Sequence, residues 1–269
     1  MPLPIRANIV GVRVSITRYD EVVEAVIGAA RAMESLLVTA ADVHQLMQAR
    51  RDPLYAAVVN SFDLVTPDGQ PVRWGMRWTR QAQLAERVYG PTLMLRVCAA
   101  ACTENLPVFF YGSREETLRR LTRSLQARFP DLTIAGQRMG RFRPLTPSEQ
   151  EADAEAIRAS GARVVFVGMG CPRQEWWAFH MRERLSMPVI TVGAAFDFHA
   201  GIVQQAPEFM QRHGLEWLFR LSREPRRLWH RYLVLNPQYL PLVVAQALKL
   251  RRFACATDLR GARERPCPG

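Results

Sequence analysis

The sequence is almost free of lysine: Lys249 is the only one among its 36 basic residues, and all the others are arginines. With 25 acidic residues, the formal net charge is 36 − 25 = +11. A guanidinium group makes planar, bidentate contacts with phosphates and carboxylates. This composition therefore favours anionic partners, namely phosphorylated ligands, an anionic membrane surface or nucleic acid.

Cysteine pairs and long apolar segments are also missing. The five cysteines are an odd number without Cys-x-x-Cys or zinc-type spacing, so we expect a reducing, cytosolic compartment. The first residues lack the pattern of a signal peptide. Residues 232–248 are uncharged, but Asn236, Pro237 and Pro241 interrupt a segment that is too short to span a bilayer. No Asp-x-Asp motif occurs, so we expect neither a metal nor a cofactor.

Short apolar runs alternate regularly with segments of helical periodicity. The predicted strands cover residues 36–39, 63–66, 107–111, 132–136, 163–167 and 187–192. The alternation predicts an α/β fold with a single doubly wound, Rossmann-like, mostly parallel sheet over residues 1–205. Residues 206–255 predict a helical, arginine-rich C-terminal appendage, and residues 256–269 predict a disordered tail.

The segment 161–201 predicts strand, glycine turn, helix, strand and a second turn. Gly168 and Gly170 interrupt the first strand, and Pro172 stands where proline is favoured in a first helical turn. Parallel strands bring both turns to the carboxyl edge of the sheet, where open α/β folds bind ligands. We therefore predict the anion-binding half of an active site here. Its candidate residues are Gly168, Gly170, Arg173, Gln174, Glu175 and Asp197.

Two carboxylates, Asp42 and Asp68, follow predicted strands and should lie at the same edge. Asp68-Gly69 is also a common pair in ordinary turns, and this alternative stays open. Farther along, residues 212–231 hold six arginines and two glutamates. Such a run is either a solvated basic face or, because Trp217 and Trp229 lie among the arginines, a surface that binds membranes and phosphate.

The succession ADVH, PDG, ERVYG, VGMGCPRQE, FDFHAG, QQAPE and GLEWLFRLSREPRR resembles the WecG/TagA/CpsF family of bacterial glycosyltransferases from about Ile9 to Tyr232. The resemblance implies an inverting, metal-independent enzyme at the cytoplasmic face of the membrane. Such an enzyme moves a hexose from a UDP-sugar to a sugar primer on a polyprenyl diphosphate, with no nucleic-acid partner. The ERVYGPTLM variant resembles exopolysaccharide-assembly members, which favours a glucose-type donor over N-acetylmannosamine.

The resemblance also implies roles for single residues. Asp68 matches the catalytic carboxylate, and Arg87 matches an active-site arginine. Gln174, Glu175 and Asp197 match positions that hold the donor. The appendage arginines that close over the diphosphate are matched by Arg220 and Arg227, and Arg231 adjoins a third such position, occupied here by His230. Asp42 stands where the family usually has an amide, and Arg173 where lysine is commoner.

Transfer with inversion needs a base for the acceptor hydroxyl, and Asp68 is our candidate. Burial or a neighbouring carboxylate would raise its pKa toward neutrality, and we expect Asp42 to be that neighbour. Backbone N–H groups of residues 168–174 and the appendage arginines would hold the diphosphate. His44 and His199 are alternative bases that rank below Asp68, and Glu175 is alternatively a first-turn residue favoured by the helix dipole.

Two other classes of protein stay open at this point. Gly168-x-Gly170 occurs in nicotinamide-dependent oxidoreductases, but Arg173 occupies the place of the third glycine of that fingerprint. The basic C-terminal region also fits a non-catalytic protein that binds a membrane surface or nucleic acid. Paired carboxylate loops facing a glycine turn would be superfluous in such a protein.

Overall fold

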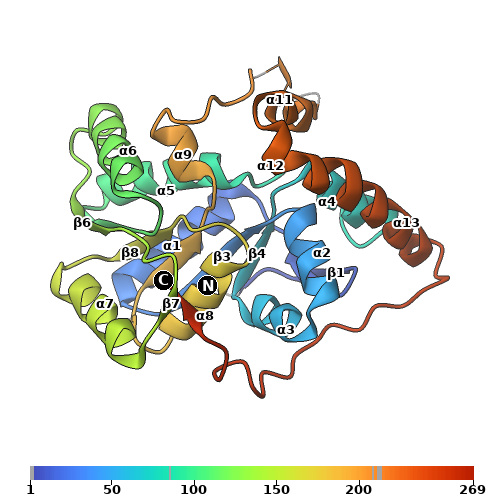
Figure 1. Cartoon of the computed structure of the whole chain (residues 1–269), viewed down its shortest axis with the longest axis horizontal. Coiled ribbons are helices and arrows are strands. Elements are labelled where there is room, and N and C mark those ends of the chain that lie inside the picture. The colour runs from blue at the N-terminus through green and yellow to red at the C-terminus, as the bar shows by residue number, and fades with distance from the viewer. Residues whose placement is uncertain (1–2, 85, 208, 211–213) are drawn as a thin grey trace.

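The computed structural model describes residues 3–84, 86–207, 209–210 and 214–269 (Figure 1). Glu208, which ends the QQAPE motif, and Arg212 lie outside the described residues. The elements in chain order are β1 (Arg6–Ile9), β2 (Val12–Ser15), α1 (Tyr19–Ala32), β3 (Leu36–Ala41), α2 (Val43–Arg51), α3 (Pro53–Ser61), β4 (Leu64–Pro67), α4 (Gln70–Trp78), α5 (Gly90–Thr103), β5 (Val108–Tyr111), α6 (Glu115–Arg128), β6 (Ile134–Arg138), β7 (Pro144–Leu145), α7 (Pro147–Ala159), β8 (Val164–Val167), α8 (Arg173–Met181), β9 (Pro188–Thr191), α9 (Ala195–His199), α11 (Glu216–Arg223), α12 (Pro225–Trp229), the π-helix η1 (His230–Leu235), α13 (Asn236–Ala247) and β10 (Cys267–Pro268).

The main sheet has six strands in the order β4-β3-β9-β8-β5-β6, and every neighbouring pair is parallel. This confirms the predicted α/β fold with a doubly wound, Rossmann-like sheet. Because β3, β4, β8 and β9 all run in the same direction, the loops that follow them leave from one edge.

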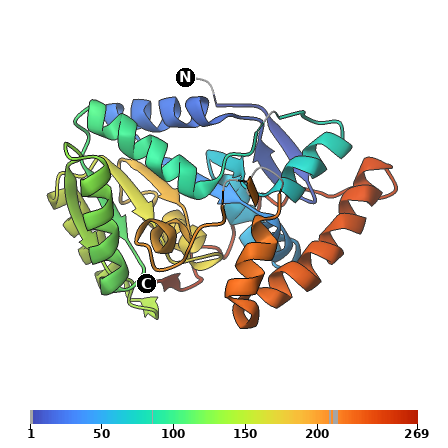
Figure 2. The ribbon, with the colours of Figure 1, turned by 90° about the horizontal axis from the view of Figure 1, so that it is seen from above.

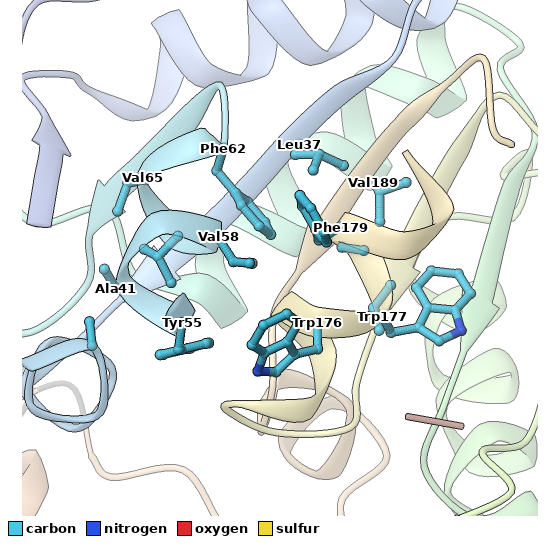
Figure 3. Close-up of a cluster of buried hydrophobic side chains, with 14 of the residues drawn as sticks. Leu37, Ala41, Tyr55, Val58, Phe62, Val65, Trp176, Trp177, Phe179 and Val189 are labelled. Carbon is cyan, nitrogen blue, oxygen red and sulfur yellow. The ribbon is translucent and has the colours of Figure 1, made fainter. Parts of the chain in front are cut away.

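Successive residues along the strands point alternately into two separate apolar cores. Leu37 and Val165 point into one core, whereas Val38 and Phe166 point into the other. The first core is filled from α2, α3 and α8, and Figure 3 shows Trp176 of α8 beside Tyr55 of α3. The second is filled from α1, α5 and α6, and α1 packs along α5 (Figure 2). Burial on both faces explains why the strand sequences are continuously apolar.

The C-terminal helices lie against the α/β unit, with α13 beside α4 (Figure 1). Tyr239 and Val243 of α13 are fully buried in the core that also holds Met76 of α4. The C-terminal helices thus share a core with the α/β unit, and the domain boundary near residue 205 stays a prediction. Among the described residues, no helix has both the length and the apolar content needed to cross a bilayer.

The structure differs from the expectation of a disordered tail. Asn60 Nδ2 donates a hydrogen bond of 2.9 Å to the carbonyl of Ala256. The chain then returns to the main body, where Cys267 and Pro268 pair antiparallel with β7 (Figure 1). Cys267 is 1% exposed. The tail is held by backbone pairing, by Asn60 and by ion pairs of Arg263 with Glu183 and of Arg265 with Asp52, which its own polar composition does not reveal.

Gly168, at the end of β8, is required by close packing. A Cβ atom there would lie 2.4 Å from Cδ2 of Phe196. We predict that Gly168→Ala lowers the free energy of unfolding by about 1–3 kcal/mol, because overpacking forces the ring or the strand to shift. Urea denaturation measures this. In Gly28→Ala, on the exposed side of α1, the new methyl group meets no atom within 4 Å and should stabilise by about 0.5–1 kcal/mol. Equal effects of the two substitutions would contradict the packing argument.

Candidate active site

A cavity of about 930 Å³ opens at the carboxyl edge of the sheet. Its walls come from the loops after β3, β4, β8 and β9 and from α11, α12 and η1. The structure brings all of the sequence-predicted site residues into this wall, namely Asp42, Asp68, Arg87, Gly168, Gly170, Arg173, Gln174, Glu175, Asp197, Arg220, Arg227 and Arg231.

Asp68 lies directly after β4 and is partly exposed toward the cavity. Its Oδ2 accepts a hydrogen bond of 3.2 Å from the amide of Gly90. Burial raises the pKa of Asp68 from 3.8 to about 6, Arg87 opposes the rise, and the charge of Glu216 adds to it. The carboxyl group is therefore poised to change its protonation state near neutral pH.

Asp42 does not act on Asp68 in the way that we expected. Its Oδ1 caps α2 by accepting a hydrogen bond of 3.0 Å from the amide of Gln45. Its Oδ2 forms an ion pair with Nη2 of Arg231. Because Arg231 balances the charge of Asp42, the neighbouring carboxylate that raises the pKa of Asp68 is Glu216 instead.

Arg87 belongs to a compact cluster with Tyr89 and Glu216. Glu216 Oε2 accepts from Arg87 Nη2 at 2.6 Å, and Oε1 accepts from the Tyr89 hydroxyl at 2.7 Å. The guanidinium carbon of Arg87 lies 4.2 Å from the centre of the Tyr89 ring. Arg87 therefore faces the cavity with its position fixed by a residue of α11.

The glycine turn after β8 offers fewer free N–H groups than we expected. The amide of Gly168 donates to Tyr111 O at 2.9 Å, and the amide of Gly170 donates to Gln174 Oε1 at 3.1 Å. Arg173 Nη2 also turns back, to the carbonyl of Met169 at 2.9 Å. These contacts make the turn rigid, but they occupy donors that we had predicted for an anion.

Glu175 is 0% exposed, in the wall behind Gln174. Its carboxylate accepts hydrogen bonds from Gln174 Nε2 at 2.8 Å, Tyr55 Oη at 3.0 Å, Thr39 Oγ1 at 3.3 Å and Thr191 Oγ1 at 3.4 Å. Burial raises the pKa of Glu175, and the hydrogen bonds from Gln174, Tyr55 and Thr39 oppose the rise. Glu175 thus fixes Gln174, which in turn holds the amide of Gly170.

Arg220 is the most deeply placed arginine of the C-terminal helices, with 9% exposure. Its guanidinium carbon lies 5.2 Å from the centre of the Phe198 ring, and its buried Nε has no hydrogen-bond partner among the described residues. Burial lowers the pKa of Arg220, but Tyr232, Tyr89, Glu216 and Asp68 together raise it above its usual value. A buried guanidinium donor without a partner is suited to an anionic ligand.

Asp197 lines the cavity from α9. Burial raises the pKa of Asp197, the charges of Arg227, Arg114 and Arg220 oppose the rise, and Glu224 adds to it. Arg227 is exposed and pairs with Glu224. Burial lowers the pKa of both histidine candidates. His44 lines the cavity, whereas His199 Nε2 is 2.9 Å from the carbonyl of Pro91.

The residues of the cavity wall that sequence reasoning missed include Tyr89, Arg114 and Glu216. Arg114 follows the turn at the end of β5, and the strand-end rule that selected Asp42 and Asp68 would have found it. Tyr89 lies within the ERVYG motif and Glu216 within GLEWLFRLSREPRR, and arginines were the candidate residues in both motifs. Within the described residues, no group of three histidine, cysteine or acidic side chains is arranged to hold a metal ion.

Comparison with known proteins identifies the chain as a glycosyltransferase. It belongs to the WecG/TagA/CpsF family of glycosyl transferases, whose family model matches residues 7–253. A relative from Bacillus spizizenii, an N-acetylglucosaminyldiphosphoundecaprenol N-acetyl-beta-D-mannosaminyltransferase, is 32% identical over 198 residues, which cover 73% of this chain and 74% of the relative. The resemblance inferred from the motifs is thereby confirmed.

The burial of Asp68 predicts a cost in stability. Folding raises the pKa of Asp68 from 3.8 to about 6, so the folded state disfavours the ionised carboxylate. The free energy of unfolding therefore falls as the pH rises through this range. Asp68→Asn should therefore raise the free energy of unfolding at pH 7.5 by about 1–3 kcal/mol, and the gain should vanish near pH 4. Urea denaturation at both pH values measures this, with exposed Asp131→Asn as the control. A gain of the same size at both pH values would contradict the assignment.

Proposed function

We propose that this chain is an inverting, metal-independent glycosyltransferase that moves a hexose from a UDP-sugar to a sugar on a polyprenyl diphosphate, in the assembly of a cell-surface polysaccharide. The observation that carries the proposal is Asp68, a carboxylate with a pKa of about 6 that faces a cavity walled by Arg87 and Arg220. Sugar transfer needs a base that takes the proton of the acceptor hydroxyl and cations that hold the leaving diphosphate. In a member of a glycosyltransferase family, a carboxylate with a raised pKa beside two arginines fits both needs.

The proposed chemistry has one displacement step. The acceptor hydroxyl oxygen attacks the anomeric carbon of the donor on the face opposite the diphosphate, and Asp68 takes its proton. The bond between the anomeric carbon and the diphosphate oxygen breaks, and UDP leaves with the electron pair. Asp68 must be ionised to act, so kcat/KM should fall as the pH drops below about 6.

The donor diphosphate would meet arginine instead of a metal ion. Arg220, whose Nε has no partner in the described part of the chain, and Arg227 approach the cavity from the C-terminal helices. Arg231 adds a third guanidinium beside Asp42. A cavity of about 930 Å³ lies in the usual range for sites that enclose a substrate. Gln174 and Asp197, which both line the cavity, are proposed to contact the nucleotide sugar.

Two donors follow from the sequence, a glucose-type UDP-sugar and UDP-N-acetylmannosamine. The name of the Bacillus spizizenii relative supports N-acetylmannosamine, with an N-acetylglucosaminyl diphosphoundecaprenol as acceptor. We take this pair as the first to assay. Membership of a glycosyltransferase family also favours this function over the oxidoreductase and the non-catalytic binder.

A lipid-linked acceptor requires contact with the membrane, which we place at the cytoplasmic face. Along α12, η1 and α13, exposed apolar residues recur at helical spacing and form one stripe: Trp229, Leu233, Pro237, Pro241, Val244 and Leu248. Exposed basic residues flank both ends of the stripe, namely Arg226, Lys249, Arg251 and Arg252. An apolar face bordered by cations is typical of a helix that lies in the interface of an anionic membrane.

Asp68→Asn tests the proposed base. It should lower kcat by about 100- to 10,000-fold, because the acceptor proton loses its receiver. The affinity for UDP, measured by calorimetry, should stay within about threefold of the wild type, because the arginines that hold the diphosphate are unchanged. Transfer to a short-chain lipid diphosphate acceptor is assayed in EDTA, in which the wild type should stay active. Loss of UDP affinity with turnover preserved would refute the role.

The exposed apolar stripe is tested by Leu233→Ser combined with Leu248→Ser, two residues that are 56% and 64% exposed. The double variant should bind anionic phospholipid vesicles at least about tenfold more weakly in cosedimentation, because it loses apolar area that the bilayer would bury. Met33→Ser with Met139→Ser removes exposed apolar side chains elsewhere and should bind as the wild type does. Equal binding by both double variants would place the membrane contact on another surface.

A further inference from the structure

We propose that Glu216 is a positioning residue of the transfer reaction. From α11, Glu216 holds Arg87 and Tyr89, and the segment that contains these two residues holds Asp68 in place. The inference rests on the proposed role of Asp68 as the base. No contact between Glu216 and substrate is required.

Both oxygens of the Glu216 carboxylate are engaged by one short segment of chain. Arg87 Nη2 lies 2.6 Å from Oε2 and the Tyr89 hydroxyl 2.7 Å from Oε1, although these residues are more than 120 positions away in the sequence. The side chains of Arg87 and Glu216 are only 15% and 9% exposed. Arg87 also lies over the Tyr89 ring, so each member of the cluster restrains the other two.

The same segment touches the base on its other side. The amide of Val88 donates to Pro67 O at 2.9 Å, and the amide of Gly90 donates to Asp68 Oδ2 at 3.2 Å. Residues 87 and 89 thus face α11, whereas residues 88 and 90 face the end of β4. This alternation makes residues 87–90 a rigid connection, because moving Glu216 would disturb the residues on either side of the amide that holds Asp68.

The charge of Glu216 also bears on the base. The charged and titratable groups that act on Asp68 come from α11, from the segment before α5 and from the start of α1, and they are Glu216, Arg220, Arg87, Tyr89 and Tyr19. Glu216 offsets the positive charge of Arg87, which would otherwise draw the pKa of Asp68 down. A buried ion pair adds little net stability, whereas removing one partner leaves the other uncompensated. In this proposal the ion pair fixes the positions of Arg87 and Glu216 and balances the charge next to Asp68.

Glu216→Gln tests the inference, because glutamine keeps the shape of the side chain and removes its charge. The acid limb of the kcat/KM profile should move to lower pH by about one unit, and kcat at pH 8 should fall about tenfold, because Arg87 then acts unopposed on Asp68. Glu216→Asp, which keeps the charge, should leave the acid limb in place. Glu86→Gln removes an exposed carboxylate next to Arg87 and should match the wild type. An unmoved acid limb in Glu216→Gln would overturn the inference.

A second measurement needs no turnover. The stability gained by Asp68→Asn at pH 7.5 should shrink to less than half in a Glu216→Gln background, since the ionised Asp68 is then less disfavoured. A gain that is equal in both backgrounds would overturn the coupling, whatever the activities are. If instead Asp68→Asn retains turnover, the base assignment fails, while this cycle still decides the role of Glu216. Should Glu216→Gln fold poorly, Tyr89→Phe removes only the phenol contact; a lower kcat with an unmoved acid limb supports the inference, and unchanged kinetics overturn it.

Discussion

The parallel direction of β3, β4, β8 and β9 is the constraint on which the site depends. Parallel strands place all of their carboxyl ends at one edge, so residues far apart in the sequence meet there without any loop having to travel across the molecule. Asp42, Asp68 and the glycine turn at 168–170 owe their proximity to this arrangement alone. The buried strands supply the rigidity, and the loops are free to carry charged residues that would be unfavourable in the cores.

The abundance of arginine has several structural uses besides anion binding. Arg6 donates to the backbone carbonyls of Asn60 and Phe62. Nη2 of Arg182 donates to both carboxylate oxygens of Asp63. These guanidinium groups tie the N-terminal hairpin and α8 to the start of β4. Only a subset, including Arg87 and Arg220, reaches the cavity. The net charge was therefore a guide to chemistry only when combined with the positions of the strand ends.

The sequence allowed the sheet, the glycine turn at 168–170 and the carboxylates at the strand ends to be predicted, because each depends on local pattern and on strand direction. The second predicted turn, residues 193–201, contains the short helix α9 instead. It did not reveal that Asp42 is neutralised by Arg231 or that Glu216 is buried. A glutamate in an arginine-rich helix has the same local pattern whether water or Arg87 surrounds it, and the partner is 129 residues away. The ordered tail escaped prediction for the same reason, because side chains of distant elements, namely Asn60, Glu183 and Asp52, contact it.

The contacts between the first hairpin and the last helix bear on how the molecule is made. Gln246 accepts from the amide of Val10 at 2.9 Å and donates to the carbonyl of Asn8 at 2.7 Å, while Asn8 Nδ2 donates to the carbonyl of Phe253 at 2.6 Å. These partners follow the hairpin by 236 to 245 residues, so the ribosome makes the hairpin well before them. The polar groups at the hairpin turn must therefore stay hydrated until residues 246–253 have been made. This corner of the molecule can close only after that point.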